Sequence, residues 1–266
     1  MFNFTLYKRE MKKSILTLVI FAGVLTIYIT MIVQMFDPEM ASILNQFSEI
    51  MPGVMTAVGM SGTVTTLIGF MSSYLYGMLL LLFPMVYVVL RAHGLIGKYV
   101  DRGSIVALVS APIKRRAIAF TQMKALASGL FLLVSYITLL EIVCSEVVFP
   151  GELEIGSILL LNVGLLCLQL FIGGICFLAS CVFNDAKYSV GIGAGVPALM
   201  YVIQMLANIG GSVENARYAT FFTLFDPDGL IAGETAAIAG IVVLFVGACA
   251  LFVAAIVVFS KKDLHI

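Results

Sequence analysis

Residues 155–184 read IGSILLLNVGLLCLQLFIGGICFLASCVFN. No side chain in this stretch is charged, and its apolar residues form continuous runs. An α-helix needs about 20 apolar residues to cross the hydrocarbon core of a bilayer. The stretch therefore predicts a transmembrane helix. It argues against a membrane β-barrel, in whose strands apolar and polar residues alternate.

The whole chain shares this character. Of its 266 residues, 61% are hydrophobic and 11% are charged, whereas soluble domains have roughly 45–50% apolar and about 25% charged residues. A net charge of zero and the lack of polar low-complexity tracts exclude disorder and nucleic-acid binding. The five cysteines lie in apolar runs without a CxxC pair, so we expect no metal site or disulfide framework.

Six stretches are long enough to cross a membrane, and only the third contains a charged residue, Glu141. We therefore expect an all-α integral membrane protein with six transmembrane helices, forming a single transmembrane domain over residues 1–266. The predicted spans are 15–35, 71–90, 125–145, 157–183, 188–209 and 236–259.

The basic residues predict the orientation. All of the 15 lysines and arginines except Arg217 fall in the N-terminal arm, the loop between spans two and three, the turn between spans four and five, or the C-terminal tail. Cytoplasmic loops carry an excess of Lys and Arg. We therefore expect a multi-pass protein of the plasma membrane with both termini in the cytoplasm.

Two segments beside the first span have amphipathic patterns. Phe4, Tyr7 and Met11 lie opposite Lys8 and Lys12 on a helix, which predicts an N-terminal interfacial helix in the headgroup region. The alternative is a disordered basic start that only sets orientation. On the other side of the membrane, the sequence Asp-Pro-Glu at 37–39 is a helix-start signal, and residues 40–51 carry an apolar stripe. We expect an outer amphipathic helix that either packs on the spans or lines an exit for substrate.

The loop between spans two and three predicts a short helix at the cytoplasmic boundary. Asp101 can cap two turns that carry Leu108 and Val109, and Pro112 disfavours helix at the residue before it. A compact helix with exposed apolar side chains fits a groove on a partner protein.

This segment also carries a family resemblance. Its sequence DRGS at 101–104, Leu108, SAP at 110–112 and Arg115 is similar to a pattern in the permease subunits of ABC type-2 exporters, also described as the type V exporter fold. The sequences FDPDGL at 225–230 and FSKKDL at 259–264 resemble that family's outer segment and its closing residues. One departure is Tyr99, where the family often has glutamate.

The resemblance implies a transport complex. The permease would pair with a second copy of itself or a paralogous permease, and would dock on separate ABC ATPase chains. Its coupling residues would be Asp101, Gly103, Leu108, Val109, Pro112 and Arg115.

We expect neither catalysis nor a bound cofactor on this chain. It has no GxxxxGK[ST] nucleotide-binding motif, so ATP and Mg would bind the partner. Paired acids or His clusters at membrane depth, which an intramembrane enzyme needs, are also missing from the sequence. The expected partners are therefore the ATPase, the second permease and membrane lipid, without nucleic acid.

The predicted function is ATP-driven export of hydrophobic or amphipathic cargo, with amphipathic, cytolytic peptides as the preferred class. The alternative is a membrane scaffold, or an immunity or sensor subunit, that binds a partner without moving substrate. Candidate pathway residues are Phe70, Tyr74, Met78, Glu141 and Gln204.

Each of these candidates has a second interpretation. Phe70, Tyr74 and Met78 share one face of span two, which either lines the pathway or contacts lipid. We expect Glu141, near the outer end of span three, to reach the lipid headgroups; the alternative is a role in gating or substrate contact. Gln204 shares a helical face with Asn208, and this face either joins helices or lines a pathway.

Small residues and prolines predict details of helix packing. The pairs Gly191/Gly195, Gly173/Gly174 and Ala236/Gly240 indicate close contacts between helices. Pro84 and Pro197 should kink spans two and five.

Overall fold

The computed structural model describes residues 2–36, 52–57, 66–97, 114–183 and 185–261. Within these ranges the chain contains helices and no strands, and six helices are long and apolar enough to cross a bilayer. The predicted all-α fold with six membrane-spanning helices is confirmed at this level. Five of the spans are α1 (Phe4–Met35), α8 (Arg115–Val148), α9 (Ile155–Val182), α10 (Ala186–Asn208) and α12 (Thr235–Lys261).

The remaining span consists of four consecutive helical segments, and shorter helices lie near the ends of the bundle. The segments of the span are α4 (Leu67–Met71), the π-helix η1 (Ser72–Leu79), α5 (Leu80–Ala92) and the π-helix η2 (His93–Gly97). The shorter helices are α3 (Pro52–Ala57), the 3₁₀ helices η3 (Gly211–Ala219) and η4 (Phe221–Leu224), and α11 (Pro227–Ile231).

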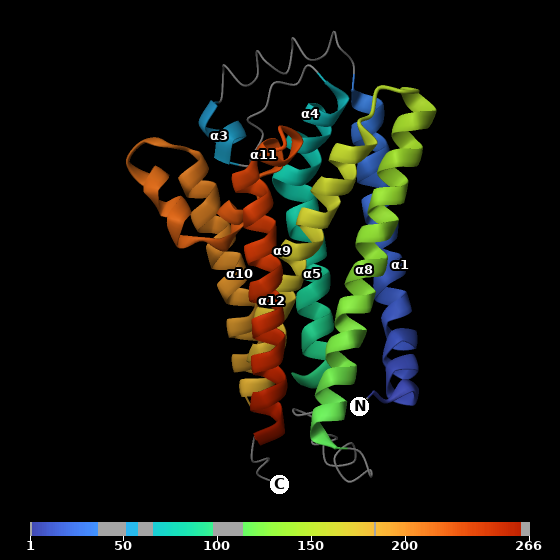
Figure 1. Cartoon of the computed structure of the whole chain (residues 1–266), viewed down its shortest axis with the longest axis vertical. Coiled ribbons are helices and arrows are strands. Elements are labelled where there is room, and N and C mark those ends of the chain that lie inside the picture. Colours follow the sequence, from blue (N-terminus) through green and yellow to red (C-terminus); the bar gives the residue numbers. More distant parts are fainter. Residues whose placement is uncertain (1, 37–51, 58–65, 98–113, 184, 262–266) are drawn as a thin grey trace.

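The six long helices run side by side along the long axis of the molecule, with both termini at one end (Figure 1). α9 is the most buried of them and packs against α12, α10, α5 and α8, while α1 packs mainly on α8. Its lack of charge, which decided the sequence interpretation, fits this central position, because each face of α9 meets apolar side chains.

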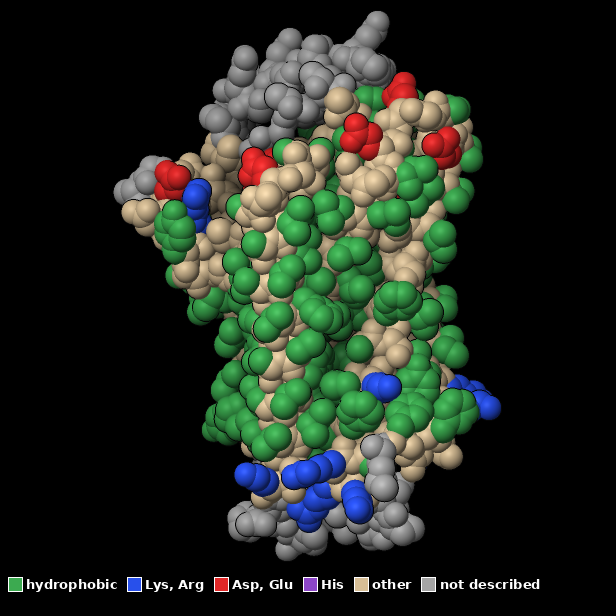
Figure 2. All heavy atoms as spheres, in the orientation of Figure 1, with side chains coloured by type: hydrophobic (Ala, Val, Ile, Leu, Met, Phe, Trp, Pro, Cys, Tyr) green, Lys and Arg blue, Asp and Glu red, His purple; other side chains and the backbone are tan. Residues whose placement is uncertain are grey.

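Charged side chains gather at the two ends of the bundle and leave an apolar belt between them (Figure 2). Lys and Arg lie mostly at the end with both termini, and Asp and Glu mostly at the opposite end. The belt carries many exposed large apolar residues, for example Leu16 at 71% and Leu139 at 63% relative exposure. In water such a surface would be unfavourable, whereas hydrocarbon chains of lipid cover it at no cost. We call the two ends the basic end and the acidic end.

The observed spans extend beyond the predicted ones, mainly at the basic end. Span one begins at Phe4 rather than at residue 15, and span three at Arg115 rather than at residue 125. These extensions contain lysines and arginines, which the criterion of an uncharged stretch excludes, but which long helices carry at the membrane boundary.

The N-terminal segment is not a separate interfacial helix; it forms the first turns of α1. Asn3 caps the helix by accepting a hydrogen bond from the Leu6 backbone N–H, 2.9 Å away. Leu6, Glu10 and Ser14, four residues apart, are all buried. No proline interrupts the helix, and this buried face continues into the bundle. The prediction therefore identified an amphipathic helix but assigned it the wrong partner, the lipid headgroups.

Pro84 explains a polar contact between spans two and four. Because proline has no backbone N–H, the carbonyl of Leu80, four residues earlier, lacks its usual helical donor. The side chain of Gln169 on α9 supplies one, with Nε2 2.9 Å from the Leu81 carbonyl oxygen and 3.4 Å from that of Leu80. Gln169 thus stabilises the start of α5.

The glycine predictions are correct for α9 and wrong for α10. A Cβ atom at Gly174 would lie 2.9 Å from Leu251 Cβ on α12, so this glycine permits close packing. Gly191 and Gly195 are exposed and a Cβ there would meet nothing within 4 Å. The close contact of α10 is at Gly193, where a Cβ would lie 3.3 Å from the Cα of Cys176 on α9.

Candidate functional site

A cavity of about 900 Å³ opens at the acidic end of the bundle, among α10, the second span, the 3₁₀ helices, α11 and the start of α12. We call it the acidic-end cavity. Its wall is mixed. Apolar residues in it include Leu81, Met205, Phe222, Leu224, Phe225 and Val243, and polar residues in it include Gln204, Asn208, Glu214, Arg217, Asp226 and Asp228.

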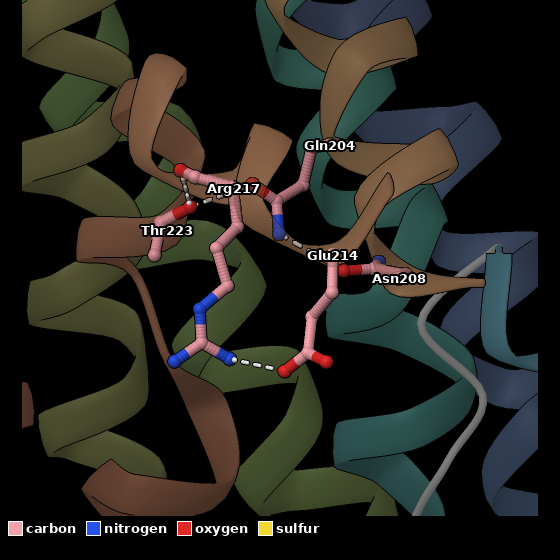
Figure 3. A network of polar contacts seen from close by, with 5 residues as sticks. All are labelled: Gln204, Asn208, Glu214, Arg217 and Thr223. Carbon is pink, nitrogen blue, oxygen red and sulfur yellow. Dashed lines mark hydrogen bonds and ion pairs between the residues drawn. The ribbon is translucent and has the colours of Figure 1, made fainter. Parts of the chain in front are cut away.

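A network of polar contacts holds one side of the cavity in shape (Figure 3). Gln204 Nε2 donates to Asn208 Oδ1 at 2.9 Å, and Thr223 Oγ1 lies 2.9 Å from Gln204 Oε1. The Thr223 hydroxyl also reaches the carbonyl oxygen of Arg217. The network therefore ties α10 to η3 and η4.

Arg217 and Glu214 form an ion pair at the rim, with Nη1 and Oε1 3.5 Å apart and both side chains about half exposed. Such exposed pairs contribute little to stability, typically less than about 1 kcal/mol. Both residues stay accessible to a charged ligand from the cavity.

Local signals in the sequence explain how the chain turns into this wall. Gly210 ends α10 with φ of +84°, a conformation that favours glycine. Asp226 caps α11 by accepting from the Gly229 backbone N–H at 3.1 Å, and Pro227 takes the first helical position. A Cβ at Gly240 would collide with the carbonyl oxygen of Leu224, so only glycine lets η4 approach α12 this closely.

Asp228 faces the cavity and is held by Ser72, whose Oγ donates to Oδ1 at 3.3 Å. Partial removal from water and the nearby Asp226 carboxylate raise the pKa of Asp228, and the hydrogen bond from Ser72 offsets part of this rise. Asp228 therefore binds a proton or a cationic partner more readily than an ordinary surface aspartate.

A second polar cluster lies inside the bundle, where Glu141 of α8 is completely buried. Its Oε2 accepts from the Tyr76 hydroxyl at 2.9 Å and from Asn162 Nδ2 at 2.7 Å. Asn162 Nδ2 is also 2.7 Å from the Tyr76 hydroxyl. The expectation that Glu141 reaches the headgroups is therefore wrong, because the rotation of α8 directs this side chain toward the second span and α9.

The two polar sites share one residue. Tyr76 lies in the wall of the acidic-end cavity, and its hydroxyl donates to Glu141. It belongs to the π-helix η1, in which the Leu80 N–H bonds the Leu75 carbonyl five residues earlier. π-Helical turns of this kind are frequent at functional sites. Ser72, at the start of the same π-helix, holds Asp228.

The structure separates the predicted pathway residues. Gln204 lines the acidic-end cavity, and Glu141 contacts its wall residue Tyr76. Phe70 is buried and packs on Phe36 and Tyr74, at ring-centroid distances of 5.6 and 4.6 Å, so it faces the end of α1. Tyr74 and Met78 are half-buried against the apolar core. These three residues do not line the acidic-end cavity.

Most of the predicted coupling segment falls on residues that are not described. Asp101, Gly103, Leu108, Val109 and Pro112 lie outside the described residues, as does the amphipathic stripe at 40–51. Arg115, the last residue of the coupling pattern, is the first residue of α8 at the basic end.

Sequence reasoning missed Tyr76, Asn162 as a partner of Glu141, and the acids of α11. Asp226-Pro227-Asp228 carries the same helix-start signal that indicated a helix after Asp37, and it could have located α11. No sequence signal marks the π-helix that aims Tyr76 at Glu141.

Comparisons with models of protein families, with curated proteins and with solved structures find no match to this chain. The function is therefore argued from the residues and their arrangement.

Proposed function

We propose that this chain is the permease subunit of an ATP-driven exporter that moves amphipathic molecules out of the cell, energised by separate ATPase chains. The single observation that carries this proposal is the acidic-end cavity in a six-helix membrane bundle. A bundle that served only as a scaffold would gain nothing from a cavity of this size between its helices, because filling it would add packing energy.

The lining of the cavity supports a cargo class. One part of the wall is aromatic and aliphatic, with Phe222, Phe225 and Met205, and the polar part contains the acids Glu214, Asp226 and Asp228 against one base, Arg217. An amphipathic molecule with a cationic polar face matches both parts, and flexible Met-rich surfaces accept varied shapes. Cationic amphipathic peptides are the cargo that we infer.

The separation of charge supports the orientation. Lys and Arg gather at the basic end together with both termini (Figure 2), so the positive-inside rule puts that end in the cytoplasm and the cavity toward the outside. The cytoplasmic end is where the segment that resembles a coupling helix, residues 101–115, would meet an ATPase.

The orientation is tested by thiol labelling in a cysteine-free background. A cysteine at Glu152, at the acidic end, should react with a membrane-impermeant reagent in intact cells. A cysteine at Lys187, at the basic end, should react only after permeabilisation. The reverse pattern would contradict the orientation.

The energy source is tested by purifying the tagged chain from its native membranes and assaying ATP hydrolysis of the eluate. The proposal predicts a co-purifying ATPase that is lost in the double variant Leu108→Asp/Val109→Asp and kept in the control Glu152→Gln. A chain that elutes without ATPase activity, or a double variant that keeps it, would contradict the assignment.

A further inference from the structure

The buried cluster around Glu141 has an unequal arrangement of hydrogen bonds. Oε2 of the carboxyl group receives both donors, the Tyr76 hydroxyl and Asn162 Nδ2. Oε1 of the same group is buried and has no partner among the described residues, and neither has Asn162 Oδ1. Two buried oxygen atoms on contacting side chains are thus left without donors.

An ionised Glu141 would be unfavourable in these surroundings. The ion pairs of the described residues, Lys13 with Glu10 and Arg217 with Glu214, lie elsewhere. Burying a carboxylate without a cationic partner costs several kcal/mol, at least roughly, even after the protein relaxes.

The titratable groups around the cluster oppose a negative charge as well. Tyr76 on η1 is the titratable side chain that contacts Glu141, and α9 contributes only the neutral Asn162. Beyond Tyr76, the acidic-end cavity holds Glu214, Asp226 and Asp228 against Arg217. A carboxylate at position 141 would add a further anion to this region.

We propose that Glu141 and Asn162 form an intramembrane proton-binding site. A proton on Glu141 Oε1 changes this atom from acceptor to donor, and Asn162 Oδ1 is the acceptor for it. One proton therefore satisfies both unpartnered oxygens and removes the uncompensated charge, while Tyr76 and Asn162 Nδ2 continue to donate to Oε2.

Tyr76 gives this site a route to water. It lies in the wall of the acidic-end cavity, so a movement of η1 away from α8 and α9 would bring the carboxyl group into contact with the cavity. The proton would then leave to the acidic end, and the charged carboxylate would favour the separated arrangement. This inference concerns the ligand of the buried cluster and does not depend on the identity of any cargo or ATPase.

Infrared spectroscopy of the purified full chain in lipid nanodiscs tests the proposal. At neutral pH the wild-type chain should show a carbonyl-stretch band of a protonated carboxylic acid, which moves to lower wavenumber in D₂O. The band should be absent from Glu141→Gln, whose amide has nearly the shape of the neutral acid. It should remain in the matched control Glu146→Gln, which replaces an exposed acid on the same helix.

A second variant keeps the test decisive if Glu141→Gln fails to fold. Tyr76→Phe removes one donor to Oε2, so the same band should persist and move to higher wavenumber. Two results would overturn the proposal. One is the lack of any protonated-acid band that depends on Glu141 or Tyr76. The other is a carboxylate band assigned to Glu141 that responds to Na⁺ or K⁺, which would make the site a cation site.

Discussion

Two carboxyl groups contact the same π-helix, and their surroundings differ completely. Ser72 of η1 holds Asp228 at the edge of the acidic-end cavity, and Tyr76 of η1 holds Glu141 in the interior. Asp228 is exposed to the cavity, whereas Glu141 has no exposed surface. Water can replace a lost partner of Asp228 but cannot reach Glu141. The comparison teaches that the cavity network is built to be adjusted, and the buried cluster to hold helices together.

The largest effect should follow removal of a buried partner. Asn162→Leu keeps the volume of the side chain but takes away a donor to Glu141, so the free energy of unfolding should fall by about 2 kcal/mol. The matched control in the cavity, Asn208→Leu, should change it by less than about 0.5 kcal/mol, because that side chain is exposed. Chemical unfolding of both variants in nanodiscs compares them; equal losses would remove the distinction between the two regions.

A smaller effect is expected at the proline of the second span. Gln169→Leu leaves the Leu80 and Leu81 carbonyls without a side-chain donor, which should cost about 1 kcal/mol. Gln204→Leu, at the cavity wall, should cost clearly less, since water can bond its former partner. The same unfolding assay measures both, and a Gln204 variant that is the less stable one would show that the cavity network is structural.

The smallest effect concerns pH at the cavity. Because burial and Asp226 raise the pKa of Asp228 above its ordinary value of 3.8, the folded chain keeps a proton that the unfolded chain has already lost. Stability from this group is therefore full below pH 3.8 and is lost as pH rises through the folded-state pKa. Asp228→Asn should flatten this part of the curve of unfolding temperature against pH.

Asp226→Asn gives the complementary result for the same group. It removes the like charge and should lower the pKa of Asp228, which moves the loss of stability to lower pH. A wild-type curve that neither variant changes would show that Asp228 does not titrate differently in the folded chain.

The fold followed from composition to a large degree, because a stretch such as 155–184 has few alternatives to a membrane helix. The direction of each side chain did not. α8 and α9 are apolar on every face, so periodicity could not show that Glu141 and Asn162 point at one another. α10 carries Gly191, Gly193 and Gly195, and only packing selects Gly193 for the contact with α9.

The candidate site was predictable where local rules act. The spacing of Gln204 and Asn208 put them on one face, and the structure joins them in the cavity network (Figure 3). The aromatic face of the second span misled the prediction, because Phe70 and Tyr74 pack toward Phe36 of α1 rather than into the cavity. Composition shows that such residues are apolar, and only the tertiary arrangement shows what covers them.

The most direct test of the account is ATP-dependent transport of a labelled cationic amphipathic peptide into inside-out vesicles from the native host. The account predicts accumulation that needs ATP, weakens severalfold in Asp226→Asn/Asp228→Asn, and is unchanged in Glu152→Gln, an acid at the same end but outside the cavity lining. Accumulation that is independent of ATP or of this chain would contradict it, and so would full transport by the double variant.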